Sequence, residues 1–413
     1  MRTGPIRGLL VTVLTVALTG PVTATTASAR VLPEHTRQAA APVPRQGPLV
    51  AWGLNTDGEL GTGDTTSYLS PIVVNRPFGL RASSARTGVF SVALNSSGQV
   101  YAWGRGEQGE MGNGAFTSRL RPVRVRLPKG VKVRSVREGF QFAVALTTTG
   151  RVLTWGYGVL GQLGNGHRVS RNAPVFVRLP RGVRITAVSA FDNGALALTS
   201  TGRVLAWGSN VSGQLGNGKK ASTDTPVRVK LPKHALVTSI AAGADQLFAV
   251  TSTGGMLAWG SNNDGQLGTG HTGGISRVPV RVHLPRGAKV VSASSGIFHA
   301  LAQTTTGKVL AWGNNLQGQL GIGTRKASNV PVWVHLPKVA HIVSIAAGRY
   351  HNLAQTRGGT LLGWGDDAFG QMGDGGFDDF LLPGRIFVPG TVIAIGAGPL
   401  ANDSMAVVKE LVS

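Results

Sequence analysis

The dipeptide Trp-Gly recurs seven times along this chain of 413 residues. The intervals between successive tryptophans are 51, 52, 52, 52, 53 and 52 residues, and a Leu-Gly or Met-Gly pair follows each tryptophan by eight residues. A repeat this regular indicates one supersecondary unit copied seven times. We expect each repeated tryptophan to be structural and to pack between neighbouring units; the set is Trp52, Trp103, Trp155, Trp207, Trp259, Trp312 and Trp364.

Each unit reads as four short strands. Apolar and polar residues alternate in stretches bounded by Gly, Pro and Thr, which is typical of strands, and no amphipathic helix of useful length occurs. In one unit we expect strands at Pro122–Leu127, Val131–Val136, Phe142–Leu146 and Arg151–Trp155, and then a long loop from Gly156 to Pro174. Four antiparallel strands per unit and seven units predict an all-β fold, a seven-bladed β-propeller.

The two ends of the repeat region are incomplete in complementary ways. Leu49–Gly53 matches a third strand with no first or second strand before it. Val392–Gly398 and Ser404–Val408 match a first and a second strand with no tryptophan strand after them. We therefore predict a propeller over 49–413 whose last blade is closed jointly by the N- and C-terminal strands, which removes exposed sheet edges.

The first 29 residues resemble a secretory signal peptide. Arg2 and Arg7 precede an apolar stretch from Leu9 to Leu18, and Ala27–Ala29 provides small residues for cleavage. That stretch is too short to span a bilayer. Residues 30–48 are rich in Ala and Pro and read as a leader. We expect a secreted monomer, extracellular or cell-wall associated, without a membrane span in the mature chain.

The formal net charge of the chain is +23, with 41 Lys and Arg against 18 Asp and Glu, and there is no cysteine. Such a surface favours anionic partners: nucleic acid, a cell-wall polymer or an acidic protein. The alternative is that the charge serves only solubility. The absence of cysteine excludes stabilisation by disulfides.

Basic residues recur on one predicted face. In a propeller blade, the turn after the outermost strand and the turn after the second strand lie on the same face, which we call the crossover face; the other turns form the loop face. A Leu-Pro turn at the outer strand is followed by a basic residue in five units, namely Lys129, Arg181, Lys233, Arg286 and Lys338. The hairpins of the crossover face add Arg151, Arg203 and Lys308. We predict that these eight residues form a basic arc that binds polyanions, with solvation alone as the alternative.

A second candidate surface lies on the loop face, near the propeller axis. Aromatic residues are expected there at Phe90, Phe140, Phe142, Phe298 and Tyr350. Aromatic side chains beside mixed charge are typical of protein-binding centres. The alternative is ordinary core packing.

The unit from Ser239 to Gly270 carries a glycine, an apolar strand, a turn, Trp-Gly and Leu-Gly in order. It resembles the regulator of chromosome condensation repeat family, and the resemblance covers about residues 49–408. The chain is identified as a secreted bacterial member, more distantly similar to the propeller-type β-lactamase inhibitor. The resemblance implies a seven-bladed propeller. Thr87 and Phe191 depart from the family glycine, and the family histidine occurs only at His299 and His351.

The sequence favours a non-catalytic module that binds a protein partner or an anionic cell-surface polymer; DNA would bind only non-specifically. An inhibitor of an extracellular enzyme such as a β-lactamase is the alternative, and guanine-nucleotide exchange, the activity of the family's founding members, or a propeller enzyme come after it. We expect no catalytic residues, no cofactor and no metal site. Two G-x-G-x-x-G matches, at Gly104 and Gly156, lack the strand-to-helix context of a nucleotide site.

Overall fold

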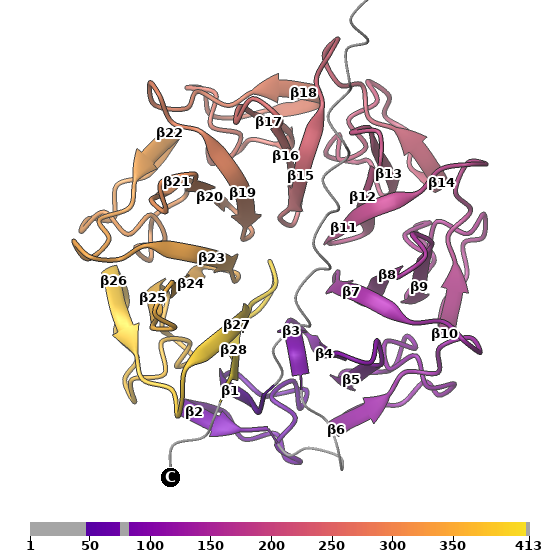
Figure 1. Ribbon diagram of the computed structural model, residues 1–413, viewed down its shortest axis with the longest axis horizontal. Coiled ribbons are helices and arrows are strands. Elements are labelled where there is room, and N and C mark those ends of the chain that lie inside the picture. Colours follow the sequence, from indigo (N-terminus) through magenta and orange to yellow (C-terminus); the bar gives the residue numbers. More distant parts are fainter. Residues whose placement is uncertain (1–46, 75–81, 410–413) are drawn as a thin grey trace, which may run out of the picture. The chain divides into compact units, whose positions relative to one another are not determined.

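A computed structural model describes residues 47–74 and 82–409. The predicted signal peptide at 1–29 and nearly all of the leader at 30–48 lie outside the described residues. The described chain forms seven four-stranded sheets, and every strand pair is antiparallel (Figure 1). The prediction of an all-β, seven-bladed propeller is confirmed.

We number the blades from the first inner strand. The inner strands of blades 1 to 7 are β3 (Ala82–Arg86), β7 (Val133–Glu138), β11 (Ile185–Phe191), β15 (Val237–Ala242), β19 (Val290–Ser295), β23 (Ile342–Ala347) and β27 (Val392–Gly396). The second strands are β4 (Phe90–Asn95), β8 (Phe142–Thr147), β12 (Gly194–Thr199), β16 (Gln246–Thr251), β20 (His299–Thr304), β24 (His351–Thr356) and β28 (Asp403–Val408). The third strands are β5 (Val100–Gly104), β9 (Val152–Gly156), β13 (Val204–Gly208), β17 (Met256–Ser261), β21 (Val309–Gly313), β25 (Leu361–Gly365) and β1 (Leu49–Gly53). The outer strands are β6 (Arg119–Arg124), β10 (Arg171–Phe176), β14 (Thr223–Arg228), β18 (Ile275–Arg281), β22 (Ser328–Trp333), β26 (Phe380–Ile386) and β2 (Tyr68–Val73).

The ring of blades is closed. Each inner strand contacts the inner strand of the next blade, and β27 of blade 7 contacts β3 of blade 1 (Figure 1). Blade 7 has the strand order β2-β1-β28-β27, so the N-terminal strands pair with the C-terminal ones. Trp52 of β1 lies opposite Ser404 of β28 in this pairing. The predicted joint closure is confirmed.

The outer strands begin earlier than the sequence pattern indicates. β6 starts at Arg119 and contains Pro122, whereas we expected a strand from Pro122 to Leu127. Proline lacks an N–H group and is tolerated on an edge strand. The ladder between β5 and β6 is also irregular at this point. Beyond Val125 the chain leaves the sheet, because the Arg126 N–H donates to the carbonyl of Gly112 at 2.8 Å instead of to a strand.

The repeated tryptophans join each blade to the one before it. All seven indoles are fully buried. The Nε1–H of each donates to a backbone carbonyl of the preceding blade at 2.7–2.9 Å. Trp207, for example, donates to Gln162, and Trp52 closes the circle by donating to Gln371. The expected structural role of the tryptophans between units therefore includes a polar contact as well as packing.

The acceptor residue and the glycine two positions later shape the socket for each tryptophan. The acceptor is Glu or Gln in every blade, and its side chain accepts the N–H of the residue two positions before it at 2.7–2.9 Å. The glycine of the Leu-Gly pair has positive φ, and at Gly216 a Cβ would lie 2.9 Å from Nε1 of Trp259. Glycine is therefore required for both its conformation and its size.

The departures from the family glycine have local explanations. In blade 2, a Cβ on Gly139 would overlap the ring of Phe142, which starts the second strand. Blade 3 exchanges these positions, because Phe191 supplies the ring and Gly194 makes the room for it. In blade 1, Thr87 instead donates a hydrogen bond from its hydroxyl to Asp403 of blade 7.

Replacing Trp207 by Phe tests the contact between blades 2 and 3. The substitution keeps an aromatic ring but leaves the buried carbonyl of Gln162 without a donor, so we expect the free energy of unfolding to fall by about 1–3 kcal/mol. Urea denaturation followed by circular dichroism measures it. Trp333 lies outside the repeat and is exposed, so Trp333→Phe should change stability by less than about 0.5 kcal/mol. Equal effects of the two substitutions would refute the structural role of the indole hydrogen bond.

Glu110 predicts a pH-dependent contribution to stability. Burial raises the pKa of Glu110 to about 7, and its Oε1 has no partner. Because the folded-state pKa lies above the unfolded value of 4.5, the contribution of this carboxyl to the stability of the protein is fully present below about pH 4.5. That contribution is lost as the pH rises through about 7. Glu110→Gln should therefore be stabilising by about 1–3 kcal/mol at pH 8 and close to neutral at pH 4.5.

Thermal or urea unfolding at the two pH values measures the difference. The matched control is Glu107→Gln, which removes the same charge from an exposed side chain nearby. A gain for Glu110→Gln that is the same at both pH values would contradict a titrating carboxyl at this position.

Candidate binding faces of the propeller

Antiparallel strands place successive connections on opposite faces of each blade. The hairpin between the second and third strands and the crossover from the outer strand to the next blade therefore share the crossover face. Backbone contacts confirm this: the Thr148 N–H of the blade 2 hairpin donates to the carbonyl of Lys132, at the end of the preceding crossover. The turns between inner and second strands and the long loops after Trp-Gly form the loop face.

All eight residues of the predicted basic arc are exposed on the crossover face: Lys129, Arg181, Lys233, Arg286, Lys338, Arg151, Arg203 and Lys308. Within the part of the chain that the structure describes, none of them is ion-paired. The three ion pairs there join Arg105 to Glu107, Arg168 to Asp224, and Arg325 to Asp379, and all are on the loop face. Arg151 and Lys308 lie over the rings of Phe176 and Trp333, and the charges of the other six residues are available to a partner.

Sequence reasoning missed a second row of cations on the same face. Lys132, Arg184 and Lys289 each follow a basic turn residue by three positions and are exposed. They end the crossovers, beside the hairpin of the next blade. The regular three-residue spacing after the Leu-Pro turn was the signal that could have revealed them.

The carboxylates are segregated on the opposite face. Of the 18 carboxylates of the chain, Glu34 and Glu410 lie outside the described residues. The other 16 lie in loop-face connections or at the strand ends that adjoin them. They are Asp57, Glu59, Asp64, Glu107, Glu110, Glu138, Asp192, Asp224, Asp245, Asp264, Asp366, Asp367, Asp374, Asp378, Asp379 and Asp403. Over the described residues, the crossover face thus carries cations without any carboxylate.

Several of the loop-face carboxyls are buried. Burial raises the pKa of Glu59, Glu138 and Asp192 to about 7. For Asp192, the nearby Asp245 raises the pKa further, while Arg349 lowers it. These groups bear less negative charge near neutrality than ordinary carboxyls, and they lie in loop-face connections or at the strand ends that adjoin them, away from the basic arc.

The predicted aromatic set on the loop face needs a correction. Phe90 and Phe142 are fully buried and belong to two of the hydrophobic cores between blades. Both start second strands, and the ring of Phe142 fills the space beside the turn glycine Gly139. Phe140 is 37 % exposed, and Phe298 and Tyr350 are half-buried with ring centroids 6.3 Å apart. Of the five predicted aromatic residues, only these three can contact a partner.

Hydrogen bonds between turns tie the centre of the loop face together. The Phe140 N–H donates to the carbonyl of Asp192 in the next blade at 2.9 Å. The backbone N–H of Arg349 donates to the carbonyl of Ala401 in its next blade, also at 2.9 Å. The Arg349 guanidinium lies 5.3 Å from the centroid of the Tyr350 ring. The remaining aromatics therefore belong to a fixed set of turns around the axis.

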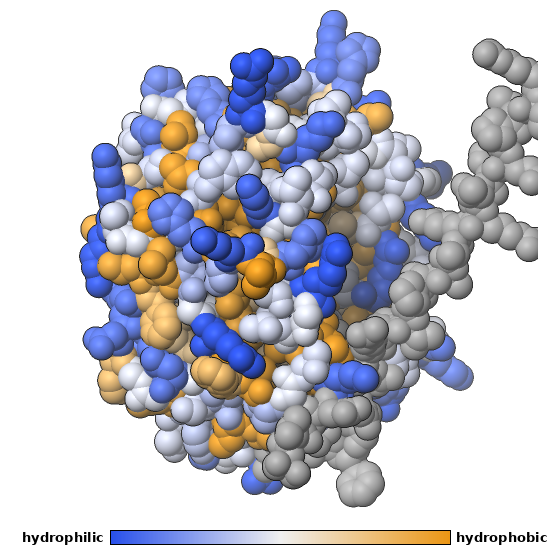
Figure 2. Space-filling model, turned by 60° about the vertical axis from the view of Figure 1, so that its left-hand side comes forward, coloured by the Kyte–Doolittle hydropathy of each residue, from blue (hydrophilic) through white to orange (hydrophobic). Residues whose placement is uncertain are grey.

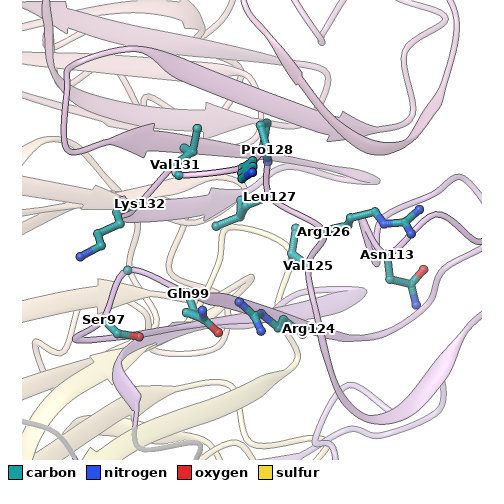
Figure 3. A pocket seen from close by; sticks show the side chains of 13 residues that line it. Ser97, Gln99, Asn113, Arg124, Val125, Arg126, Leu127, Pro128, Val131 and Lys132 are labelled. Atoms are coloured by element: carbon teal, nitrogen blue, oxygen red, sulfur yellow. The ribbon is translucent and has the colours of Figure 1, made fainter.

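A pocket of about 550 Å³ opens on the crossover face between blade 1 and its outgoing crossover (Figure 3). Its floor includes Val125 and Leu127, and polar groups come from Gln99 of the hairpin. Lys132 lies at one side and Arg124 along the outer strand, while Arg126 points away from the centre (Figure 3). The arrangement offers cations and amide donors but no carboxylate.

The surface between these features is mixed. In Figure 2, long hydrophilic side chains project between hydrophobic ones. Among residues 47–74 and 82–409, no helix has the length and apolar character required to cross a bilayer.

Comparison with known proteins identifies the fold family. Residues 166–401 match the RCC1-like domain, and residues 97–146 match the regulator of chromosome condensation (RCC1) repeat. The chain is 33 % identical over 301 residues to the ultraviolet-B receptor UVR8 of Arabidopsis thaliana, covering 72 % of this chain and 68 % of the receptor. It is 31 % identical to the human E3 ubiquitin-protein ligase HERC2 over 75 % of this chain, but it spans only 6 % of that protein.

A solved structure agrees with this assignment. Prp20p from Saccharomyces cerevisiae superposes with a TM-score of 0.79 at 24 % identity, covering 90 % of this chain and 93 % of Prp20p. The tryptophan links, the seven closed blades and these matches together show that the chain belongs to the RCC1-like family of β-propellers.

Proposed function

We propose that this propeller is a non-catalytic binding module that holds an anionic polymer, or the acidic surface of a protein, against its crossover face. The observation that carries the proposal is the segregation of charge: eight exposed cations of the arc share a face with no described carboxylate. A field of one sign attracts oppositely charged partners and raises their association rate.

The proposal has a quantitative consequence. A linear polyanion releases counterions when its charges are neutralised, and each contact with a single strand adds about 0.7 to the slope of log affinity against log salt. Engagement of the five turn residues Lys129, Arg181, Lys233, Arg286 and Lys338 would give a slope of about −3 to −4. If the cations serve only for solvation, the salt dependence of polyanion binding should not depend on the cations of one particular face.

The relatives support a binding role for this fold. Prp20p, the yeast RCC1, has been characterised for its binding to Gsp1p and histones, and it has also been crystallised bound to Kap60. A propeller of this family therefore serves as a scaffold on which partners dock, although fold alone assigns no partner. The ligase HERC2 matches over too small a part of its length to transfer its activity.

We also propose that residues 1–29 direct export, and that the protein acts outside the cell or at the cell wall. The support is the sequence pattern of a basic start, an apolar stretch and small residues before Arg30. Mass spectrometry of the N-terminus of protein recovered from the medium tests this proposal. A retained Met1 would contradict it.

A second candidate function is inhibition of an extracellular enzyme such as a β-lactamase, through the loop face. Phe140, Phe298 and Tyr350 favour it, because partly exposed aromatics near fixed charges are typical anchors for protein partners. Purified protein should inhibit β-lactamase at micromolar concentration, and Phe298→Ala with Tyr350→Ala should abolish the effect. No inhibition by the unmodified protein rejects this target.

Charge reversal on each face tests the main proposal. We expect a fivefold charge-reversal variant of the turn residues to bind fluorescein-labelled poly(glycerol phosphate) and poly-L-glutamate at least tenfold more weakly at 0.1 M salt, because attraction becomes repulsion. Its substitutions are Lys129→Glu, Arg181→Glu, Lys233→Glu, Arg286→Glu and Lys338→Glu. The matched control reverses the same number of exposed loop-face cations: Arg168, Arg171, Lys219, Lys220 and Lys326. Fluorescence anisotropy over a salt series measures both. Equal losses from the two variants would show that net charge alone, and not the crossover face, governs binding.

A further inference from the structure

A pocket in blade 3 is lined by cations from two different strands and from a crossover. It has a volume of about 380 Å³ and lies between the hairpin of β12 and β13 and the crossover that leaves β14. Arg203 from the hairpin and Arg228 from the end of β14 both line it, with Lys230 and Lys233 on the crossover. Within the described residues, neither arginine is ion-paired or donates a side-chain hydrogen bond. Like charges thus converge on one cavity without a counter-charge.

In blades 2 and 5 the hairpin cation faces an aromatic ring instead of a second cation. In blade 2 the Arg151 guanidinium lies 3.4 Å from the centroid of the Phe176 ring, and in blade 5 the Lys308 ammonium lies 5.6 Å from that of Trp333. An aromatic ring at this position attracts the hairpin cation. Blade 3 has Arg228 where blade 2 has Phe176, so its hairpin cation is left facing a second cation.

Blade 1 provides an intermediate case. Its pocket is open and has Arg124 on the outer strand, but the hairpin residue is the uncharged Gln99 (Figure 3). Of the described blades, blade 3 is therefore the one in which arginines from both walls line an open pocket.

The backbone of the blade 3 crossover is strained at the same place. His234 has a φ of 62° and is the one non-glycine residue with positive φ among those described. The matching residues in three other blades are Gly130, Gly182 and Gly287, also with positive φ. A side chain in this conformation is disfavoured by about 1 kcal/mol, and such strain concentrates at functional sites. His234 lines the Arg203 pocket.

The strained crossover also borders a second pocket. This one, about 360 Å³, lies between residues 232–236 and the hairpin of blade 4. Blade 4 has Gly255 at the position of the hairpin cation, and Arg281 of β18 lines the far wall. The two pockets lie against the same crossover, from Pro232 to Leu236, so a chain-like ligand in one lies next to the other.

We propose that the blade 3 pocket binds a phosphodiester group of a linear polyanion, with Arg203 and Arg228 each donating to it and His234 at its rim. A tetrahedral group offers oxygens to two guanidiniums that approach from different strands, whereas one planar carboxylate is matched by one arginine fork. The next group of the polymer then reaches Arg281 across the crossover. This inference rests on the proposed function and assigns the subsite that gives it chemical selectivity.

Single substitutions separate the pocket from general charge. Arg203→Gln and Arg228→Gln are expected to weaken binding of labelled poly(glycerol phosphate) at least tenfold each. Arg151→Gln removes the same charge from the same hairpin position in blade 2, where the guanidinium lies over the Phe176 ring, and is expected to weaken binding less than threefold. Anisotropy titrations at one fixed salt concentration measure all three, and thermal melts verify folding.

His234→Gly provides an independent readout. Removing a side chain from the left-handed conformation should raise the melting temperature, yet weaken poly(glycerol phosphate) binding about threefold or more. A variant that is both more stable and equally tight in binding would overturn the role of His234 at the site.

Polymer chemistry distinguishes the remaining outcomes. The Arg203→Gln loss should appear with poly(glycerol phosphate) and be much smaller with poly-L-glutamate; a loss of the same size with heparin would assign the site to tetrahedral anions generally and overturn phosphodiester selectivity. If the unmodified protein bound none of the polymers in a salt-dependent way, the proposed function itself would fail. If it bound them but Arg203→Gln and Arg151→Gln behaved alike, the pocket would be refuted while the basic face remained.

Discussion

Each blade of this protein is attached to its neighbour by a tryptophan that is buried and hydrogen-bonded at the same time. The indole of Trp259 donates to the carbonyl of Gln214, and the glycine that follows that glutamine by two residues leaves the room for the ring. The same contact occurs seven times, including the one from Trp52 to Gln371 that closes the ring. Because every blade is fixed in this way, the connections on both faces are held at regular positions, and repeated residues become repeated surface features.

The charge pattern exploits that regularity. Carboxylates occur in loop-face segments and several are buried among the blades, while the crossover face repeats cations such as Lys129 and Lys233 without counter-charges. Like charges on one face repel each other and lower the stability of the folded protein. A repeated, uncompensated arrangement of this kind favours a partner that supplies the missing negative charge, and a polymer does so over several blades at once.

Sequence periodicity predicted the architecture, the joint seventh blade and the exposed arc, because Trp-Gly spacing and Leu-Pro turns are local signals. The carboxylate segregation was also readable, since every described Asp and Glu lies in a loop-face segment once the strands are assigned. The starts of the outer strands were missed because Pro122 resembles a turn residue, yet an edge strand tolerates it. Phe142 and the pocket at Arg203 could not be placed from sequence, because the burial of a ring and the contact of Arg151 with Phe176 depend on how separate strands pack.

Footprinting of lysines in the presence of a polyanion tests most directly where the partner lies. The protein is labelled with an amine-reactive reagent, free and bound to poly(glycerol phosphate), and labelling is quantified by peptide mass spectrometry. Our account predicts protection of Lys129, Lys233 and Lys338 on the crossover face, and unchanged labelling of Lys219, Lys220 and Lys326 on the loop face. Uniform protection of both sets, or protection confined to the loop-face lysines, would contradict it.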